Sequence, residues 1–176
     1  MNKKLLSVIF GGLSVCAMPA LANTGTITFD GSITSNTCNT TVNGSGTNTV
    51  TLPPVSADLL ANSGDVAGLS GFTIDLSGCT GSLQTASAFF EPGATVNTDG
   101  RLTTAGTATN VDIQLLDGSN ANAPIVAGNT NQVNGNSYVS LSSGTASLPY
   151  AARYYATGQA GAGDLTTSVT YSIQYK

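Results

Sequence analysis

The chain has 176 residues, of which 8% are charged, and it contains no histidine. Without histidine, Ser-His-Asp and Cys-His catalytic sites and imidazole metal sites are excluded. The formal net charge of −4 argues against nucleic acid and anionic membrane surfaces as partners, because both attract basic proteins.

The first 22 residues have the pattern of a secretory signal peptide. Lys3 and Lys4 precede an apolar stretch, and Ala20-Leu-Ala22 supplies the small residues that a signal peptidase recognises. The apolar stretch is too short to be a stable membrane anchor. We therefore predict that residues 1–22 are cleaved off and that the mature protein is exported.

Cleavage after Ala22 leaves 154 of the 176 residues, a length typical of one domain. Loss of Lys3 and Lys4 leaves three basic residues against nine acidic ones, so the formal net charge becomes −6. Cleavage also removes Cys16 and leaves Cys38 and Cys79. In an oxidising compartment this pair predicts one disulfide, worth roughly 4 kcal/mol for a loop of about 40 residues. The alternative is a pair of free, buried thiols.

The mature chain shows the two-residue periodicity of β-strands and almost no helical periodicity. Near the new N-terminus, apolar residues alternate from Ile27 to Ile33. Ser56 is placed to cap a single short helical turn. Further apolar or alternating segments predict strands, in chain order, around Phe72–Leu76, Phe89–Phe90, Val111–Leu115, Val139–Leu141 and Leu148–Tyr154.

Turn residues separate these segments. Asp-Gly pairs at 99–100 and 117–118 predict tight turns, the first of them in a hairpin. The glycines between Gly158 and Gly163 predict a loop before the final strand. Glu91 and the aspartates mostly lie beside such turns, where solvated or capping carboxylates are common. We expect no catalytic site, no metal site and no cofactor.

The last twelve residues, from Leu165 to Lys176, predict a strand that runs to the C-terminal carboxylate. Every second residue is apolar, which places four side chains on one face: Val169, Tyr171, Ile173 and Tyr175. Chain ends are usually polar and frayed. An apolar strand in this place therefore needs a partner.

Seven or eight short strands in about 150 residues, with one disulfide, predict an all-β sandwich of immunoglobulin-like size. Several segments also resemble the pilins of chaperone–usher fimbriae, especially the type 1 fimbrial major subunit. Gly163 is fourteenth from the end and Tyr175 is penultimate, as in the terminal motif of that family. The other similar segments are Gly25-x-Ile-x-Phe-x-Gly31 ahead of Cys38, Gly71–Cys79, Ala108–Gly118 and Ala152–Gly158.

The resemblance covers essentially the whole mature chain. It implies an incomplete immunoglobulin-like β-sandwich that lacks its last strand, so that a groove exposes the core. Residues 23–34 would be an N-terminal donor-strand extension and residues 35–176 the pilin domain. The donor strand would present Gly25, Ile27, Phe29, Gly31 and Ile33. The acceptor groove and the chaperone-binding C-terminal strand would include Gly163, Val169, Tyr171, Ile173, Tyr175 and Lys176.

The resemblance also implies a function. The chain would be a structural subunit of a bacterial surface fimbria, exported through the periplasm, polymerised by donor-strand exchange and supporting adhesion. Its partners would be neighbouring pilins, a periplasmic chaperone that binds the carboxylate of Lys176 with basic residues, and an outer-membrane usher, but not nucleic acid. Because only Asn23 and Thr24 precede Gly25 after cleavage, this subunit is expected to fill the outermost acceptor pocket weakly.

Two alternative functions stay open at this point. The chain would fit a minor tip or adaptor pilin that binds a host ligand. It would also fit a secreted binding domain in which residues 23–34 fill the chain's own groove.

Overall fold

The computed structural model describes residues 27–31, 37–44 and 46–176. The predictions for the signal peptide, Gly25 and Ile33 lie outside these residues. The chain divides into two compact units, Met1–Ser32 and Ile33–Lys176. In the first unit, residues 27–31 are exposed and belong to no helix or strand. Within the described residues, no helix has the length and apolarity needed to cross a membrane.

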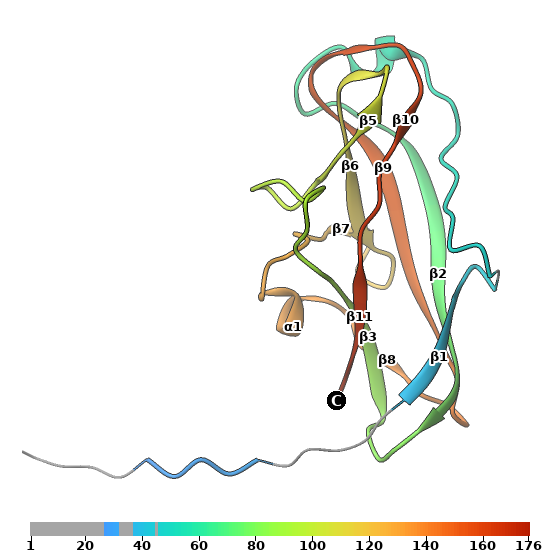
Figure 1. Ribbon diagram of the computed structural model, residues 1–176, viewed down its shortest axis with the longest axis vertical. Coiled ribbons are helices and arrows are strands. Elements are labelled where there is room, and N and C mark those ends of the chain that lie inside the picture. The colour runs from blue at the N-terminus through green and yellow to red at the C-terminus, as the bar shows by residue number, and fades with distance from the viewer. Residues whose placement is uncertain (1–26, 32–36, 45) are drawn as a thin grey trace, which may run out of the picture. The chain divides into compact units, whose positions relative to one another are not determined.

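The second unit is a β-sandwich (Figure 1), which confirms the predicted all-β class. Its larger sheet has the strand order β1-β2-β9-β6-β4, with β7 also paired to β6. These strands are β1 (Thr37–Val42), β2 (Val66–Thr80), β4 (Leu102–Thr103), β6 (Thr109–Asp117), β7 (Ala123–Pro124) and β9 (Ala146–Gly161).

The smaller sheet has the order β11-β3-β8, and all its pairs are antiparallel. Its strands are β3 (Thr85–Phe90), β8 (Val139–Ser140) and β11 (Tyr171–Tyr175). A separate pair joins β5 (Ala105–Gly106) to β10 (Leu165–Thr166). Two short helices lie in the connections: the 3-10 helix η1 (Ala57–Leu60) and α1 (Gln132–Gly135).

Local signals in the sequence account for many of these elements. Ser56 caps η1, because its hydroxyl accepts a hydrogen bond from the backbone N–H of Asp58. The predicted turn at Asp99-Gly100 closes a hairpin in which the backbone N–H of Asn97 donates to the carbonyl of Arg101. β6 ends at Asp117, the first residue of the second predicted turn.

The predicted strand lengths are wrong for the two longest strands. β2 has 15 residues and β9 has 16, and the two pair along most of their length. β9 also includes Gly158–Gly161, which the sequence predicts as loop. These glycines continue the strand because Gly161 pairs with Thr109 and the side-chain amide of Asn110 donates to the carbonyl of Gln159. A single glycine-rich segment can therefore be held extended by its neighbour.

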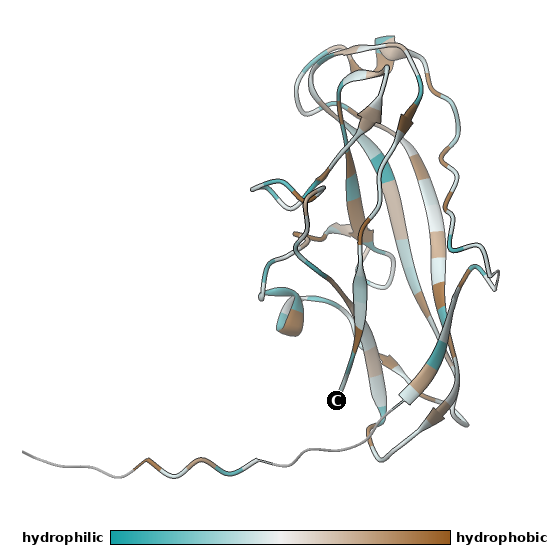
Figure 2. Cartoon of the chain, viewed as in Figure 1, coloured by the Kyte–Doolittle hydropathy of each residue, from teal (hydrophilic) through white to brown (hydrophobic). Residues whose placement is uncertain are grey.

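The core lies between the two sheets. Apolar residues alternate along β2 (Figure 2), so that Ile74 and Leu76 point inward and are 1% and 2% exposed. The larger sheet also contributes Leu115 and Leu148, and the smaller sheet contributes Phe90. Burying side chains of this size stabilises the fold by about 1.5–3 kcal/mol each.

Tyr150 connects the two sheets through the core. Its hydroxyl, carried on β9, accepts a hydrogen bond from the backbone N–H of Ala88 on β3 at 2.8 Å, and Ser87 Oγ lies 3.4 Å away. Its ring packs edge-on against Phe90 with 5.1 Å between the ring centres. The Tyr150 hydroxyl therefore supplies an acceptor for the backbone N–H of Ala88, which no neighbouring strand pairs at this position.

We expect Tyr150→Phe to lower the free energy of unfolding by about 1–3 kcal/mol, because it leaves the buried N–H of Ala88 without an acceptor. Urea denaturation of the purified protein measures this loss. Tyr154→Phe is the matched control: it lies on the same strand, and its hydroxyl has no hydrogen-bond partner among the described residues. An equal loss in both variants would contradict the role of the Ala88 contact.

Alkaline pH should weaken the same contact. Burial raises the pKa of Tyr150 above its ordinary value of 10.0. Because the pKa is raised in the folded state, the stabilisation that protonated Tyr150 gives is complete below about pH 10. It is lost as the pH rises through the pKa of the folded state. The free energy of unfolding should therefore fall above about pH 10, and less steeply in Tyr150→Phe. Parallel curves for the two proteins would assign the alkaline loss to other groups.

Candidate strand-acceptor site

The final strand has a ladder partner on one edge. Lys176 exchanges two backbone hydrogen bonds with Thr85, each of 3.0 Å, and the carbonyl of Thr170 accepts one from Glu91 at 2.8 Å. Successive residues of a strand present their backbone groups to opposite edges. The other edge therefore presents the N–H and C=O groups of Tyr171, Ile173 and Tyr175. Among the strands of the described chain, none pairs with that edge of β11.

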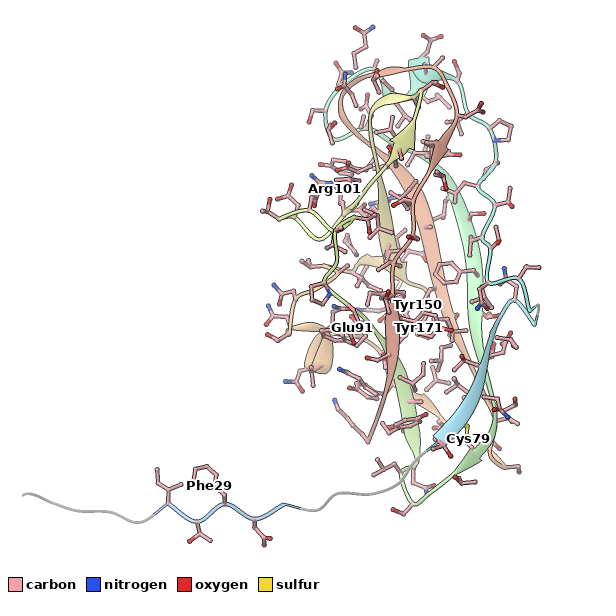
Figure 3. All side chains as sticks on the ribbon, viewed as in Figure 1. Phe29, Cys79, Glu91, Arg101, Tyr150 and Tyr171 are labelled. Carbon is pink, nitrogen blue, oxygen red and sulfur yellow. A yellow bond between two sulfur atoms is a disulfide. The ribbon has the colours of Figure 1, made fainter. Side chains whose placement is uncertain are left out.

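The inward face of this strand is incompletely covered. Val169, Tyr171, Ile173 and Tyr175 all pack against the core, as the alternation predicts, but each is only partly buried. By contrast, Ala86, Ala88 and Phe90 on the adjacent strand β3 are 0–1% exposed. Figure 3 shows Tyr171 on the strand that ends at the C-terminus. The core is therefore sealed beneath β3 and partly open beneath β11.

The sequence predicts one strand over the last twelve residues, but the structure has two. β10 pairs with β5, whereas β11 pairs with β3. Between them, side-chain hydroxyls replace the ladder: Thr95 Oγ1 donates to the carbonyl of Ser168 at 2.6 Å, and Thr167 Oγ1 donates to that of Thr103 at 2.7 Å. The strand is interrupted here because the chain changes its partner from β5 to β3. The alternation of its side chains continues across the interruption.

Gly163 lies just before β10, at a pocket of about 310 Å³ that is lined by both polar and apolar groups. A Cβ atom at this position would lie 2.5 Å from the backbone nitrogen of Ala108, so only glycine allows the approach. Gly163 is therefore close to Thr107 and Ala108 rather than to β11. The apolar side chains that line the pocket include Leu52, Val55, Leu60, Val111, Tyr154 and Leu165.

The C-terminal residue is held through its carboxylate and through its side chain. One oxygen of its carboxylate accepts hydrogen bonds from the backbone N–H groups of Gln84 and Thr85, at 2.8 and 3.0 Å. Its side-chain ammonium donates to the carbonyl of Val133 at 3.0 Å and lies 3.8 Å from the centre of the Tyr138 ring. Tyr138 is not among the predicted site residues, because a lone aromatic residue in a polar stretch carries no periodic signal.

Cys38 and Cys79 form the predicted disulfide, which joins β1 to β2. β1 is the end strand of the larger sheet and pairs with β2 alone among the described strands. The disulfide therefore holds the end strand β1 to its neighbour β2.

The described donor residues are exposed in the first unit. Ile27 is 78% exposed and Phe29 is 90% exposed (Figure 3), and a Cβ atom on Gly31 would contact nothing within 4 Å. Large apolar side chains are usually buried in a folded protein. The exposure of both side chains makes this segment available to another surface.

Asp75 is an acceptor in a network of hydrogen bonds. Ser147 Oγ donates to Asp75 at 2.6 Å, and this bond is the main reason that the pKa of Asp75 lies below its ordinary value. Thr73 and the backbone of Gly44 also donate to Asp75. Within the described residues, no group of three Asp, Glu, Cys or His side chains is placed to hold a metal ion.

Comparison with known proteins identifies the family. A sequence model of the family described as type-1 fimbrial protein, A matches residues 52–176. The chain is also 42% identical to the major fimbrial subunit SMF-1 of Stenotrophomonas maltophilia, over 93% of this chain and 99% of that protein. The chain belongs to the type-1 fimbrial protein family.

Other similarities agree with this pilin family. The chain is 32% identical to a type-1 fimbrial protein A chain of Escherichia coli, over 99% of this pilin and 98% of that protein. Its fold is similar to that of the P pilus rod subunit PapA, with a TM-score of 0.60 at 15% sequence identity over 79% of this pilin and 99% of that subunit. A chain from the structure of a chaperone–usher pilus gives a TM-score of 0.57 at 16% identity, over 92% of this pilin and all of that chain. The incomplete immunoglobulin-like pilin fold is thereby confirmed.

Replacing Cys38 and Cys79 of this pilin together by Ser should lower the free energy of unfolding by roughly 2–5 kcal/mol. The physical reason is that the open chain has more unfolded conformations. Urea denaturation under oxidising conditions measures the loss, and reduction of the unchanged protein is the control. The same midpoint in the variant and in the oxidised parent would show that the bridge is not needed.

Proposed function

We propose that this pilin is a structural subunit of a bacterial surface fimbria and polymerises by strand donation, without catalysis or a cofactor. The observation that carries the proposal is the state of β11. Its outer edge has no strand partner in the described chain, and its inward apolar row is only partly buried. A strand from another subunit would satisfy both the backbone groups and the apolar side chains. Strand addition of this kind is an established mode of recognition.

Residues 23–34 of a second copy have the properties required of the donor. Ile27 and Phe29 are exposed and two positions apart, so in an extended chain they share one face. Ile33 continues that face, and Gly25 and Gly31 would allow close approach of the two chains. Burial of each large side chain would contribute about 1.5–3 kcal/mol, in addition to the backbone ladder. Residues 35–176 would form the acceptor domain.

An unpaired apolar edge is also an aggregation hazard before assembly. We therefore include in the proposal a periplasmic chaperone that covers the edge with a strand of its own, and an outer-membrane usher at which subunits exchange it for a donor strand. The C-terminal carboxylate of Lys176 lies at the end of the same strand, where basic residues of the chaperone would bind it. The completed fibre would lie on the cell surface and support adhesion.

Neighbouring substitutions in the donor segment test the proposal. Phe29→Asp should abolish fibre growth, because it would bring a carboxylate into an apolar site, whereas Thr28→Asp should leave growth within about twofold of the parent. Residues 28 and 29 point to opposite faces of an extended strand, so the two variants add the same charge to opposite faces. Growth is measured by electron microscopy and by sedimentation of fibres assembled with chaperone and usher.

A chain that lacks residues 23–33 should form no fibres and gives the complete loss of growth for comparison. It should still bind the chaperone. Equal growth of the two Asp variants, or fibres from the deleted chain, would show that another segment is the donor. A stable monomer in which residues 27–31 are protected from proteolysis would instead show that the chain fills its own site.

A further inference from the structure

The smaller sheet is held by a segment that is not a strand. We call residues 128–138, which include α1, the α1 segment. β11 has five residues and a hydrogen-bonded ladder with β3 on one edge, so its other contacts contribute to holding it in place. The α1 segment contacts β3 through Gln132 and β11 through the hydrogen bond between Tyr138 and Gln174. It is therefore placed to stabilise the two strands beside the open edge.

Its contacts with β3 resemble the pairing of a strand. The side-chain amide of Gln132, which is 4% exposed, donates from Nε2 to the carbonyl of Phe90 at 3.0 Å, and Oε1 accepts from the N–H of Phe90 at 3.0 Å. The N–H of Gly128 donates to the same carbonyl at 2.8 Å, and Asn136 Nδ2 donates to the carbonyl of Ala88. These bonds fix the α1 segment to the edge of β3 that faces away from β11.

Its polar contacts at the other strand involve Gln174 of β11 and Lys176, which directly follows β11. The ammonium group of Lys176 donates to the carbonyl of Val133 and lies 3.8 Å from the centre of the Tyr138 ring. The hydroxyl of Tyr138 lies 3.1 Å from Gln174 Oε1 and 3.0 Å from the carbonyl of Val133, and donates to one of them at a time. A phenol is protonated at neutral pH, and burial raises the pKa of Tyr138 further above its ordinary value of 10.0.

These contacts leave the acceptor surface free. Gln174 and Lys176 alternate with Ile173 and Tyr175, so their side chains lie on the opposite face from the inward apolar row. Their backbone groups face β3 rather than the open edge, as the bonds between Lys176 and Thr85 show. Tyr138 thus holds the end of β11 from outside, without occupying any group that a donor strand would use.

We propose that Tyr138 and Lys176 are positioning residues for strand addition. They hold the C-terminal end of β11 in register on β3 before a donor arrives. The physical reason is the cost of ordering a chain end, because each residue that a donor must order on arrival costs about 1–2 kcal/mol. A strand end that is ordered only part of the time lowers the apparent affinity for the donor by the same fraction. The inference rests on the proposed function, since it concerns the same open edge.

The test uses the full mature chain and a labelled synthetic peptide with the sequence of residues 23–34. In Tyr138→Leu and Lys176→Gln, amide exchange at Gln174 should become about tenfold faster, the change expected for the loss of a partly desolvated cation–π contact. The peptide should also be captured several-fold more slowly, because fewer molecules have an ordered acceptor. Lys176→Arg keeps a cation above the ring and should behave like the parent.

A second cation–π pair supplies the matched control. The guanidinium of Arg101 lies 4.2 Å from the centre of the Tyr155 ring, and Tyr155 belongs to β9 in the larger sheet. Tyr155→Leu removes an equivalent ring away from β11, so it should lower the thermal midpoint without changing exchange at Gln174. If Tyr138→Leu fails to fold, Tyr138→Phe, which removes only the hydroxyl contacts, and Lys176→Gln carry the test.

The outcomes separate the two proposals. If the parent captures the peptide and Tyr138→Leu and Lys176→Gln capture it at the same rate, the positioning role alone is overturned. This holds even where amide exchange at Gln174 becomes faster. Faster exchange in Tyr155→Leu as well would assign the effect to general loss of stability and also overturns it. A parent chain that does not capture the peptide contradicts the proposed function, and the positioning role is then rejected with it.

Discussion

Strand β11 reaches the C-terminus with hydrogen-bond partners on its β3 edge, while the described strands leave its other edge without a partner. Unpaired backbone groups and incompletely buried apolar side chains therefore occur on the same residues. The backbone groups of Tyr171, Ile173 and Tyr175 face away from the ladder, and the side chains of the same residues cover the core incompletely. A single added strand would relieve both at once. This coincidence is the reason that we propose this edge as the site of assembly.

The rest of the second unit supports β11 and the strand beside it. The far edge of β3 is already occupied, in part by β8 and in part by the side-chain amide of Gln132. The larger sheet is held together by the long pairing of β2 with β9 and by the disulfide at β1. Tyr150 ties that sheet to β3 through the backbone of Ala88. β11 therefore lies beside strands that are firmly held, and Lys176 contacts the Tyr138 ring at its C-terminal end.

Periodicity in the sequence predicts those features that depend on neighbouring residues along the chain. The alternation of Ile74 and Leu76 predicts an inward face, and that of Tyr171 and Ile173 predicts the row beneath the open edge. It fails where a contact comes from far along the chain. The stretch before the final strand is an example, since Gly161 is held extended by Thr109. The interruption between β10 and β11 is another, because it depends on hydroxyl groups of Thr95 and Thr167.

The sequence by itself determined the all-β class, the cysteine pair, the apolar row of the last strand and the resemblance to pilins. These follow from side-chain types and spacings, which are properties of the chain before it folds. Only the tertiary structure decided which edge of β11 lacks a partner, why Gly163 must be glycine and how Tyr138 meets Lys176. Each of these is a contact between distant segments, and long-range packing is set by the whole core rather than by any local pattern.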